Sequence, residues 1–407
     1  MLRNLNIEQK KSFQELLTKL SSALDITETQ FDNLLRSYGA VGKYLEDDPQ
    51  FAQYKPVISP QGSLRLGTMI QPISDEDDID VDLVYRLTDK HSLWTQKNIK
   101  DKVGNRLKDN KFYERMLDEE GRRCWTLNYR EDSDSPKEKY HMDVLPCVAD
   151  ADYHSRLERM MSSAYSHQEI DKLSIRITDL KATNYSYDSD IKNWLKSNPD
   201  GYALWFAYRC KQDSSVARLS FREIIPINKK GTKTTLQRIV QILKRHRDIM
   251  FKDDHEDKPI SIIITTLAAK AYSGESNLLE GLTNVVFSME RYITRDIYGN
   301  YVISNPVNEE ENFADKWPTH PKRKENFFNW IEKVKSDLSN IFSSTGIQLQ
   351  NKVSATFGSR ESNRAFNAIT EKTKNDVKSG ALKIGTTAML GSVGSKVNAS
   401  NSFYGKE

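Results

Sequence analysis

The sequence predicts an α+β fold, in which a lobe built on a mixed sheet is followed by a lobe built of helices. Three observations support this prediction. Helical periodicity opens the chain, strand-like patterns fill residues 62–148, and helical periodicity returns from about Asp171. With 407 residues, 37% of them hydrophobic, the chain is long enough for about two domains with packed cores.

Two helices are expected at the N-terminus, within residues 1–50, packing on both lobes. The second helix begins at Thr27, because Gln30 three residues later completes the pattern of a capping box. Pro49 and Pro60 then bracket a short extended segment. The apolar face of the second helix consists of Phe31, Leu34, Leu35, Tyr38, Val41 and Leu45.

Strand-like patterns define a catalytic core over residues 51–170. Ile79–Leu87 alternates acidic and apolar residues at first and then becomes continuously apolar. Cys124–Arg130 and Tyr140–Val148 are typical of a strand pair, joined by the polar loop Glu131–Lys139.

Helical patterns define the second lobe, over residues 171–345. From Gly380 the chain is rich in Gly, Ser and Asn and has little periodicity, which predicts a flexible tail over residues 380–407. One amphipathic helix carries Leu236, Ile239, Val240, Leu243 and Met250, and another carries Phe327, Ile331, Val334, Leu338 and Ile341.

Composition and charge exclude several classes of protein. The net charge of +3 does not indicate a general coat for nucleic acid. Cys124, Cys147 and Cys210 are too widely spaced for a zinc knuckle and do not indicate a disulfide framework. Residues 1–11 are polar and the longest apolar run, 262–269, is too short to cross a bilayer. We therefore expect a soluble, cytoplasmic protein that needs no membrane.

The strongest chemical signal is a pair of carboxylates on one strand. Residues two apart in a strand project from the same face, so Asp80 and Asp82 lie side by side. Two such carboxylates repel each other unless a cation lies between them, and Mg²⁺ prefers oxygen ligands of this kind. Asp143, at a comparable place in another strand, can complete a second metal position, and two ions then stabilise the attacking and leaving oxygens of a phosphoryl transfer.

The choice of aspartates has one alternative, because Asp78 shares the parity of Asp80 and Asp82. The apolar run Leu83–Tyr85 starts directly after Asp82, which favours Asp80/Asp82 over Asp78/Asp80 and leaves Asp75–Asp78 to a solvated loop. Taken alone, such an acidic run is more often a solvated turn. Carboxylates that alternate within an apolar strand are nevertheless costly without a partner, and no run of Arg or Lys lies nearby to neutralise them. Metal binding is therefore the better interpretation.

Gly62 and Ser63 precede this strand and predict a phosphate-binding turn. A glycine lets backbone N–H groups approach a triphosphate closely, and the serine hydroxyl adds a donor. Gly67 and Thr68 extend the turn, and a short helix fits between the turn and the strand. A lone Gly-Ser pair carries little information, so the prediction depends on its order with the three aspartates.

This order of Gly-Ser, Asp-x-Asp and a third Asp resembles the polymerase-β-like nucleotidyltransferases. The chain resembles more closely the bacterial cGAS/DncV-like nucleotidyltransferases (CD-NTases), the SMODS-type second-messenger synthases of CBASS anti-phage systems. The resemblance covers roughly residues 30–340. The segments that carry it are Ser197–Tyr202 with Trp205-Phe206, Leu243–Asp248, Ser261–Thr266, Asn305–Asn308 and Glu311–Trp317.

The resemblance implies a polymerase-β-like nucleotidyltransferase lobe and a helical OAS-like lobe, with the active site in the cleft between them. Asp80, Asp82 and Asp143 would hold two Mg²⁺ ions, with Mn²⁺ as a substitute, and Asp143 would also help to activate the attacking ribose hydroxyl. Gly62 and Ser63 would hold the donor triphosphate. Lys244 and Ser261 match the positions that contact the triphosphate in the helical lobe. From its residue type alone Lys244 is more often a solvated helix residue, but beside Val240 and Leu243 it can border a cleft.

The resemblance also implies a function. The chain would condense nucleoside triphosphates, ATP and GTP foremost, without a template into a cyclic di- or trinucleotide such as a cGAMP-like product. A downstream effector would sense this product in anti-phage signalling, and no nucleic-acid activator is indicated. An E1/E2-like partner would conjugate the C-terminal tail, although Lys406 and Glu407 after Gly405 depart from a simple terminal Gly or Ala. An inert tail is an equally good interpretation.

Rival functions remain open from the sequence. Addition of nucleotides to an RNA end, as in poly(A)- or CCA-adding enzymes, needs a basic track for the RNA, which the near-neutral charge does not favour. A non-enzymatic nucleotide-binding scaffold would be expected to have lost one of the three carboxylates. Transfer of a nucleotide to a protein or antibiotic hydroxyl is a third rival. Base choice, linkage and ring size are not indicated, although Tyr187, Trp205 and Tyr272 are candidates for base stacking.

Overall fold

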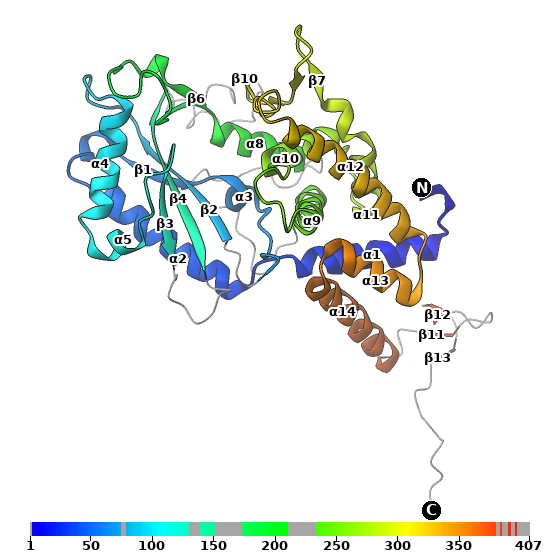
Figure 1. Cartoon of the computed structure of the whole chain (residues 1–407). Coiled ribbons are helices and arrows are strands. Elements are labelled where there is room, and N and C mark those ends of the chain that lie inside the picture. Colours follow the sequence, from blue (N-terminus) through cyan, green and yellow to red (C-terminus); the bar gives the residue numbers. More distant parts are fainter. Residues whose placement is uncertain are drawn as a thin grey trace, which may run out of the picture. The chain divides into compact units, whose positions relative to one another are not determined.

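The computed structural model describes residues 2–74, 79–129, 139–150, 173–210 and 233–379, with 383–384, 390–391 and 395–396 (Figure 1). The chain divides into two compact units. The larger comprises residues 25–335, and the smaller combines residues 1–24 with 336–407. The sequence did not indicate that the two ends of the chain belong to one unit. The boundaries predicted at residues 50, 170 and 345 stay a prediction.

The larger unit is built on a six-stranded mixed sheet, which confirms the predicted α+β fold. The strand order is β1-β2-β4-β5-β6, and β3 also pairs with β4. β2 and β4 run parallel along the whole of β2, whereas every other pair in this sheet is antiparallel. The strands are β1 (Val57–Pro60), β2 (Ile79–Leu87), β3 (Trp125–Tyr129), β4 (Tyr140–Ala149), β5 (Ile175–Ile177) and β6 (Leu195–Ser197).

One core joins this sheet to the helices α2 (Glu28–Glu46), α4 (Gln96–Lys108) and α5 (Lys111–Met116), together with Leu64 of the short helix α3 (Gly62–Leu66). The predicted capping box of α2 is confirmed, since the side chains of Thr27 and Gln30 each accept a hydrogen bond from the other residue's backbone. On the predicted apolar face Leu35 and Tyr38 are only half-buried. The fully buried positions of that face are Phe31, Leu34, Val41 and Leu45.

Helices also make up most of the remainder of the larger unit. They are α8 (Pro199–Cys210), α9 (Thr235–Met250), α10 (Ser261–Ala271), α11 (Leu278–Ser288) and α12 (Pro321–Phe342), which continues into the smaller unit. The predicted apolar faces of α9 and α12 are buried, except for the half-buried Met250 at the end of α9. Short elements link these helices: β7 (Thr294–Arg295), β8 (Tyr301–Val302), β9 (Ser304–Asn305), β10 (Asn308–Asn312) and η5 (Met289–Tyr292).

The sheet extends further along the chain than the sequence predicted. Helical patterns were expected from Asp171, but β5 and β6 add two strands to the sheet before α8 begins. Each of these strands has only three residues, which is too short to show alternation against the helical patterns around it. The described residues also include the short helical turns η1 (Leu2–Asn4), η2 (Ala52–Tyr54), α3 (Gly62–Leu66) and η4 (Ile191–Asn193).

The smaller unit contains α1 (Ile7–Ala23), the end of α12, α13 (Gly346–Phe357) and α14 (Ser359–Lys378). The rings of Phe13 and Phe342 meet edge to face at 5.0 Å, and Lys372 pairs with Glu15 at 2.6 Å. Three two-residue strands, β11 (Lys383–Ile384), β12 (Leu390–Gly391) and β13 (Ser395–Lys396), form a small sheet.

Most of the predicted flexible tail, including the last residues at which conjugation was predicted, lies outside the described residues. Within the residues that are described, no helix is both long and apolar enough to cross a membrane.

Two helical glycines give a matched test of this packing. A Cβ added at Gly104 in α4 would lie 2.2 Å from a ring carbon of Trp125 in β3, whereas a Cβ at Gly39 in α2 meets nothing within 4 Å. We expect Gly104→Ala to lower the free energy of unfolding by about 1–3 kcal/mol, because it overpacks the core. We expect Gly39→Ala to raise it by about 0.5–1 kcal/mol, because alanine favours the helix. Urea unfolding of both variants measures these changes, and equal stability of the two variants would contradict the packing described.

Candidate active site

The three predicted carboxylates lie on two neighbouring strands. β2 and β4 are parallel and in register, so that Asp80 lies opposite His141 and Asp82 lies opposite Asp143. Residues that share parity in aligned parallel strands project from the same face, so Asp80, Asp82 and Asp143 share one face of the sheet. Along β2 their neighbours Ile79, Val81 and Leu83 are buried, while Asp80 is exposed and Asp82 is half-buried. The competing residue Asp78 lies outside the described residues.

These carboxylates repel one another. Burial, together with the negative charges of Asp143 and Asp80, raises the pKa of Asp82 to about 6. The hydroxyl of Thr126 in β3 donates a hydrogen bond of 2.5 Å to Oδ1 of Asp143, which fixes one oxygen of that side chain. A cluster of this kind is stabilised by a cation.

The residues present fit a divalent cation by charge and by ligand type, although they do not form a finished cage. Within the part of the chain that the structure describes, no three His, Cys, Asp or Glu side chains are already grouped to hold a metal ion. A cation here would be held by carboxylates of β2 and β4, with its other positions left to phosphate and water. Mg²⁺ prefers this arrangement to a cage made of protein ligands alone.

Gly62 and Ser63 lie directly beside these carboxylates, at the start of α3. The backbone N–H of Gln61 donates to the carbonyl of Asp82 at 2.8 Å, which ties the turn to β2. Gly62 has a φ of +59°, and a Cβ there would lie 2.1 Å from Oδ2 of Asp82. Only glycine fits both restrictions. The turn and the carboxylate strand are therefore held in close contact.

Helix α9 fixes the path of the chain between α3 and β2. After Leu66, the last residue of α3, residues 67–71 have no regular secondary structure, and side chains from one face of α9 bind carbonyls of residues 66–71. These bonds run from Gln237 to Leu66 O (2.9 Å), Gln241 to Met69 O (2.6 Å), Lys244 to Thr68 O (3.2 Å) and Arg245 to Gln71 O (2.5 Å). The positions of α9, of the turn and of the carboxylates thus depend on one another.

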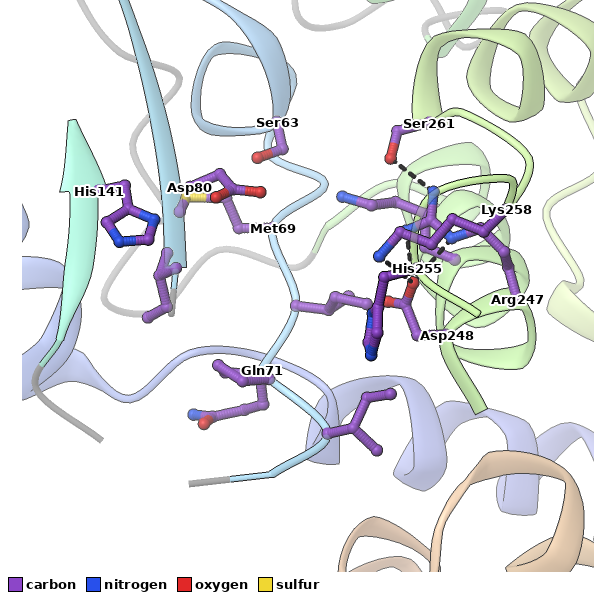
Figure 2. Close-up of a pocket in the computed structure, with 15 residues that line it drawn as sticks. Ser63, Met69, Gln71, Asp80, His141, Arg247, Asp248, His255, Lys258 and Ser261 are labelled. Atoms are coloured by element: carbon purple, nitrogen blue, oxygen red, sulfur yellow. Dashed lines mark hydrogen bonds and ion pairs between the residues drawn. The ribbon is translucent and has the colours of Figure 1, made fainter. Parts of the chain in front are cut away.

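A first pocket, of about 270 Å³, opens beside Asp80. Figure 2 shows Ser63, Asp80 and His141 on its sheet side, and Arg247, Lys258 and Ser261 on its helical side. Lys244 also lines this pocket. Hydrogen-bond donors and positively charged side chains of the helical part therefore lie across this pocket from the turn and the carboxylate strand.

A second pocket, of about 730 Å³, is lined by other residues of the same strand and turn. Gly62 and Asp82 line it together with basic, amide and aromatic side chains. The basic residues include Arg65, Arg122 and Arg123, the amides include Asn305 and Asn308, and the aromatic residues include Tyr202, Phe313 and Trp317. Its volume lies in the range of sites for small molecules.

The structure brings all seven predicted site residues to this region, and their roles stay predictions. Lys244 is buried, and this burial, with the charge of Arg247 added to it, lowers its pKa to about 8. Ser261 is the first residue of α10, and its Oγ accepts a hydrogen bond of 2.8 Å from Arg247. Lys244 and Ser261 both line the first pocket with Ser63.

Sequence reasoning missed several residues of the two pockets. Trp205 and Tyr272, two of the stacking candidates, are buried, and Tyr187 is exposed; none of the three lines either pocket. Tyr202, Phe313 and Trp317 line the second pocket instead, and all three fall within segments that already carried the family resemblance. Lys258 had no such signal, because a lysine in a polar loop has no distinctive pattern.

Known proteins match this chain by sequence. The model of a family described as the Second Messenger Oligonucleotide or Dinucleotide Synthetase (SMODS) domain matches residues 11–158. A c-di-GMP synthase of Roseivirga ehrenbergii is 30% identical over 344 residues, which cover 83% of this chain and 82% of that protein.

Solved structures match the fold. The CD-NTase CdnG of Bradyrhizobium diazoefficiens, in complex with GTP, superposes with a TM-score of 0.62 at 17% identity and covers 88% of this chain and 99% of that one. CdnC of E. coli MS115-1 with ATP gives 0.55 at 13% identity, with coverages of 88% and 98%. Vibrio cholerae DncV with the linear intermediate 5′-pppA(3′,5′)pG gives 0.52 at 15% identity, with coverages of 88% and 93%. At these identities the structures show a shared fold.

The burial of Asp82 and its repulsion by Asp143 and Asp80 predict that removing its charge stabilises the metal-free protein. The pKa of Asp82 in the folded protein, about 6, lies above the ordinary value of 3.8. The ionised carboxylate therefore destabilises the fold. This destabilisation is complete above about pH 6 and disappears below about pH 3.8. We expect Asp82→Asn to raise the free energy of unfolding by about 1–3 kcal/mol at about pH 8 in chelator. Excess Mg²⁺ should stabilise the wild type more than this variant.

Thermal and urea unfolding with and without Mg²⁺ measure both effects. The exposed Asp253→Asn is the matched control and should behave as the wild type does. A wild-type protein indifferent to Mg²⁺, or a metal-free Asp82→Asn variant less stable than the control, would contradict the electrostatics described.

Proposed function

This chain belongs to the cGAS/DncV-like nucleotidyltransferases, the SMODS-type cyclic oligonucleotide synthases, and from that premise we propose that it condenses two nucleoside triphosphates, at least one of them GTP, into a cyclic dinucleotide. The observation that carries the proposal is the register of β2 and β4. It sets Asp82 beside Asp143 and sets both next to a turn whose glycine leaves no room for a side chain. Nucleotidyl transfer requires carboxylates that can hold cations, placed beside a turn that can bind the triphosphate.

The donor triphosphate would lie in the first pocket. Ser63 offers a hydroxyl from the turn, and Lys244 and Ser261 face it from α9 and α10. Burial lowers the pKa of Lys244 to about 8, and a phosphate nearby would favour its charged form. Gly62 permits the backbone of the turn to lie close to the phosphates.

The two nucleosides would lie in the second pocket. Tyr202, Phe313 and Trp317 offer aromatic surfaces against which bases can stack, and the amides of Asn305 and Asn308 can meet base edges. Asp82 lines this pocket, whereas Asp80 lines the first. The α-phosphate therefore belongs at the carboxylates, where the two pockets adjoin.

Asp143 would accept the proton of the attacking ribose hydroxyl. One of its oxygens is held by Thr126, and the other remains to take the proton. The ribose oxygen bonds to the α-phosphorus, the bond from that phosphorus to the bridging oxygen breaks, and pyrophosphate leaves with the electron pair. Two Mg²⁺ ions held by Asp80, Asp82 and Asp143 would neutralise the triphosphate and make the ribose hydroxyl more acidic.

Two observations indicate which bases the substrates carry. The Roseivirga relative is a c-di-GMP synthase, whereas the resemblance of the sequence predicted a cGAMP-like product. Both products contain guanosine, which supports GTP as one substrate. We place the product in anti-phage signalling, sensed by a separate effector, on the strength of the resemblance alone.

Incubation of the purified protein with single and paired nucleoside triphosphates and Mg²⁺, read by mass spectrometry, tests the proposal. We expect a phosphatase-resistant cyclic dinucleotide whenever GTP is present. GTP alone suffices if the product is c-di-GMP, and ATP is needed as well if it is cGAMP. The product should fall by at least about 10³-fold in Asp80→Asn/Asp82→Asn, because the cation loses two ligands. Asp253→Asn serves again as the control.

Two results would contradict the proposal. Lengthening of an added RNA primer without any cyclic product would favour the RNA-end activity. Equal product from the double variant and the wild type would place the chemistry elsewhere in the chain.

A further inference from the structure

Lys258 is the residue that the two pockets share. It lines the first pocket with Ser63 and Asp80, and the second with Gly62 and Asp82. Among the described residues no other side chain lines both pockets. Its position on the helical side of the first pocket, near Arg247 and Ser261, is seen in Figure 2.

The border between the pockets runs through three places in the chain. At the turn, Gly62 lines the second pocket and Ser63 the first. On β2, Asp82 lines the second and Asp80 the first. Before α10, Lys258 lines both. Because the triphosphate would fill the first pocket and the nucleosides the second, the bond that breaks would lie at this border, which Lys258 also lines.

The backbone around Lys258 is held firmly on both sides. The preceding Asp257 pairs with Arg323 at 3.3 Å, and its carbonyl accepts a hydrogen bond of 3.1 Å from Asn326. The carbonyl of the following Pro259 accepts one of 3.0 Å from Arg247. The α-carbon of Lys258 is therefore placed by contacts with α9 and α12, before any ligand binds.

The ammonium group of Lys258, by contrast, is only loosely held. Its ion pair is with Oδ1 of Asp248 at 3.9 Å, an oxygen that already pairs with Arg247 at 2.6 Å. The side chain is 33% exposed, and its positive charge also acts on the carboxylate of Asp80. Lys244 differs in both respects, since it is buried and donates to the carbonyl of Thr68.

We propose that Lys258 is a catalytic residue that stabilises the departing pyrophosphate, and this inference rests on the proposed function. As the ribose oxygen bonds to the α-phosphorus, the bond to the α,β-bridging oxygen breaks and its electron pair stays on pyrophosphate. The hydroxyl proton goes to Asp143. The ammonium group of Lys258 remains protonated and donates a hydrogen bond to the bridging oxygen as negative charge grows there. A firm backbone and a loosely held, charged side chain suit this role.

Single-turnover formation of the first phosphodiester bond tests the proposal. The substrates are GTP and its analogues with CH₂, CHF or CF₂ in place of the β,γ-bridging oxygen, whose leaving groups differ in acidity. Lys258→Met should slow the reaction of GTP by about 10²-fold, because one stabilising contact to developing charge is lost. Its rates should also depend more steeply on leaving-group acidity than those of the wild type. Lys258→Arg, which keeps the charge, should recover most of the rate, and the exposed Lys252→Met should match the wild type.

Affinity for pyrophosphate, measured by calorimetry in the presence of Mg²⁺, gives a readout that needs no turnover. We expect Lys258→Met to weaken it by about tenfold and Lys252→Met to leave it unchanged.

Three results would overturn the inference. Lys258→Met could be as fast as Lys252→Met, or it could be slow with an unchanged dependence on leaving-group acidity, which indicates a merely structural role. In both cases the wild type still forms product, so the proposed function stands. Absence of product from the wild type and Lys252→Met alike would overturn the proposed function and this inference together.

Discussion

The parallel pairing of β2 with β4 is the constraint on which the rest of the site depends. Parallel strands in register place residues of equal parity on the same face, so the pairing sets Asp82 beside Asp143. Apolar neighbours such as Val81 and Val144 are buried in the sheet and hold the register, because a slip by one residue would turn them to the other face. The folded chain thereby holds repelling carboxylates together, and burial together with this repulsion raises the pKa of Asp82.

Two further devices use that constraint. Gly62 lies so close to Asp82 that a side chain there would collide with the carboxylate, so the turn before α3 is packed directly against the carboxylate strand. Helix α9 then holds the end of α3 and the irregular segment 67–71 by their carbonyls, through Gln237, Gln241 and two basic residues. Asp25, before α2, accepts hydrogen bonds from Arg238 and Gln241 of the same helix and so links it to the N-terminal part of the larger unit. Rigid secondary structure on both sides therefore sets the distance between the turn and the helical wall of the first pocket.

Local patterns made much of this predictable from the sequence. The bounds of β2, the pairing of β3 with β4 and the capping box at Thr27 follow from alternation and from side-chain chemistry within a few residues. The grouping of Asp80, Asp82 and Asp143 near Gly62 followed from their order along the chain. The strands β5 and β6 could not be predicted, because three residues show no period. The aromatic residues of the second pocket and Lys258 could not be placed either, since their positions depend on how α10, α12 and β10 meet the sheet in three dimensions.

The most direct measurement of the central claim is a crystal structure with Mn²⁺ and a non-hydrolysable GTP analogue, in which anomalous scattering locates the metal. We predict anomalous peaks bound by carboxylates of Asp80, Asp82 and Asp143, a triphosphate that contacts Ser63, and a guanosine in the pocket lined by Tyr202. A nucleotide bound elsewhere, or Mn²⁺ absent from the face shared by β2 and β4 while the nucleotide is present, would contradict the account.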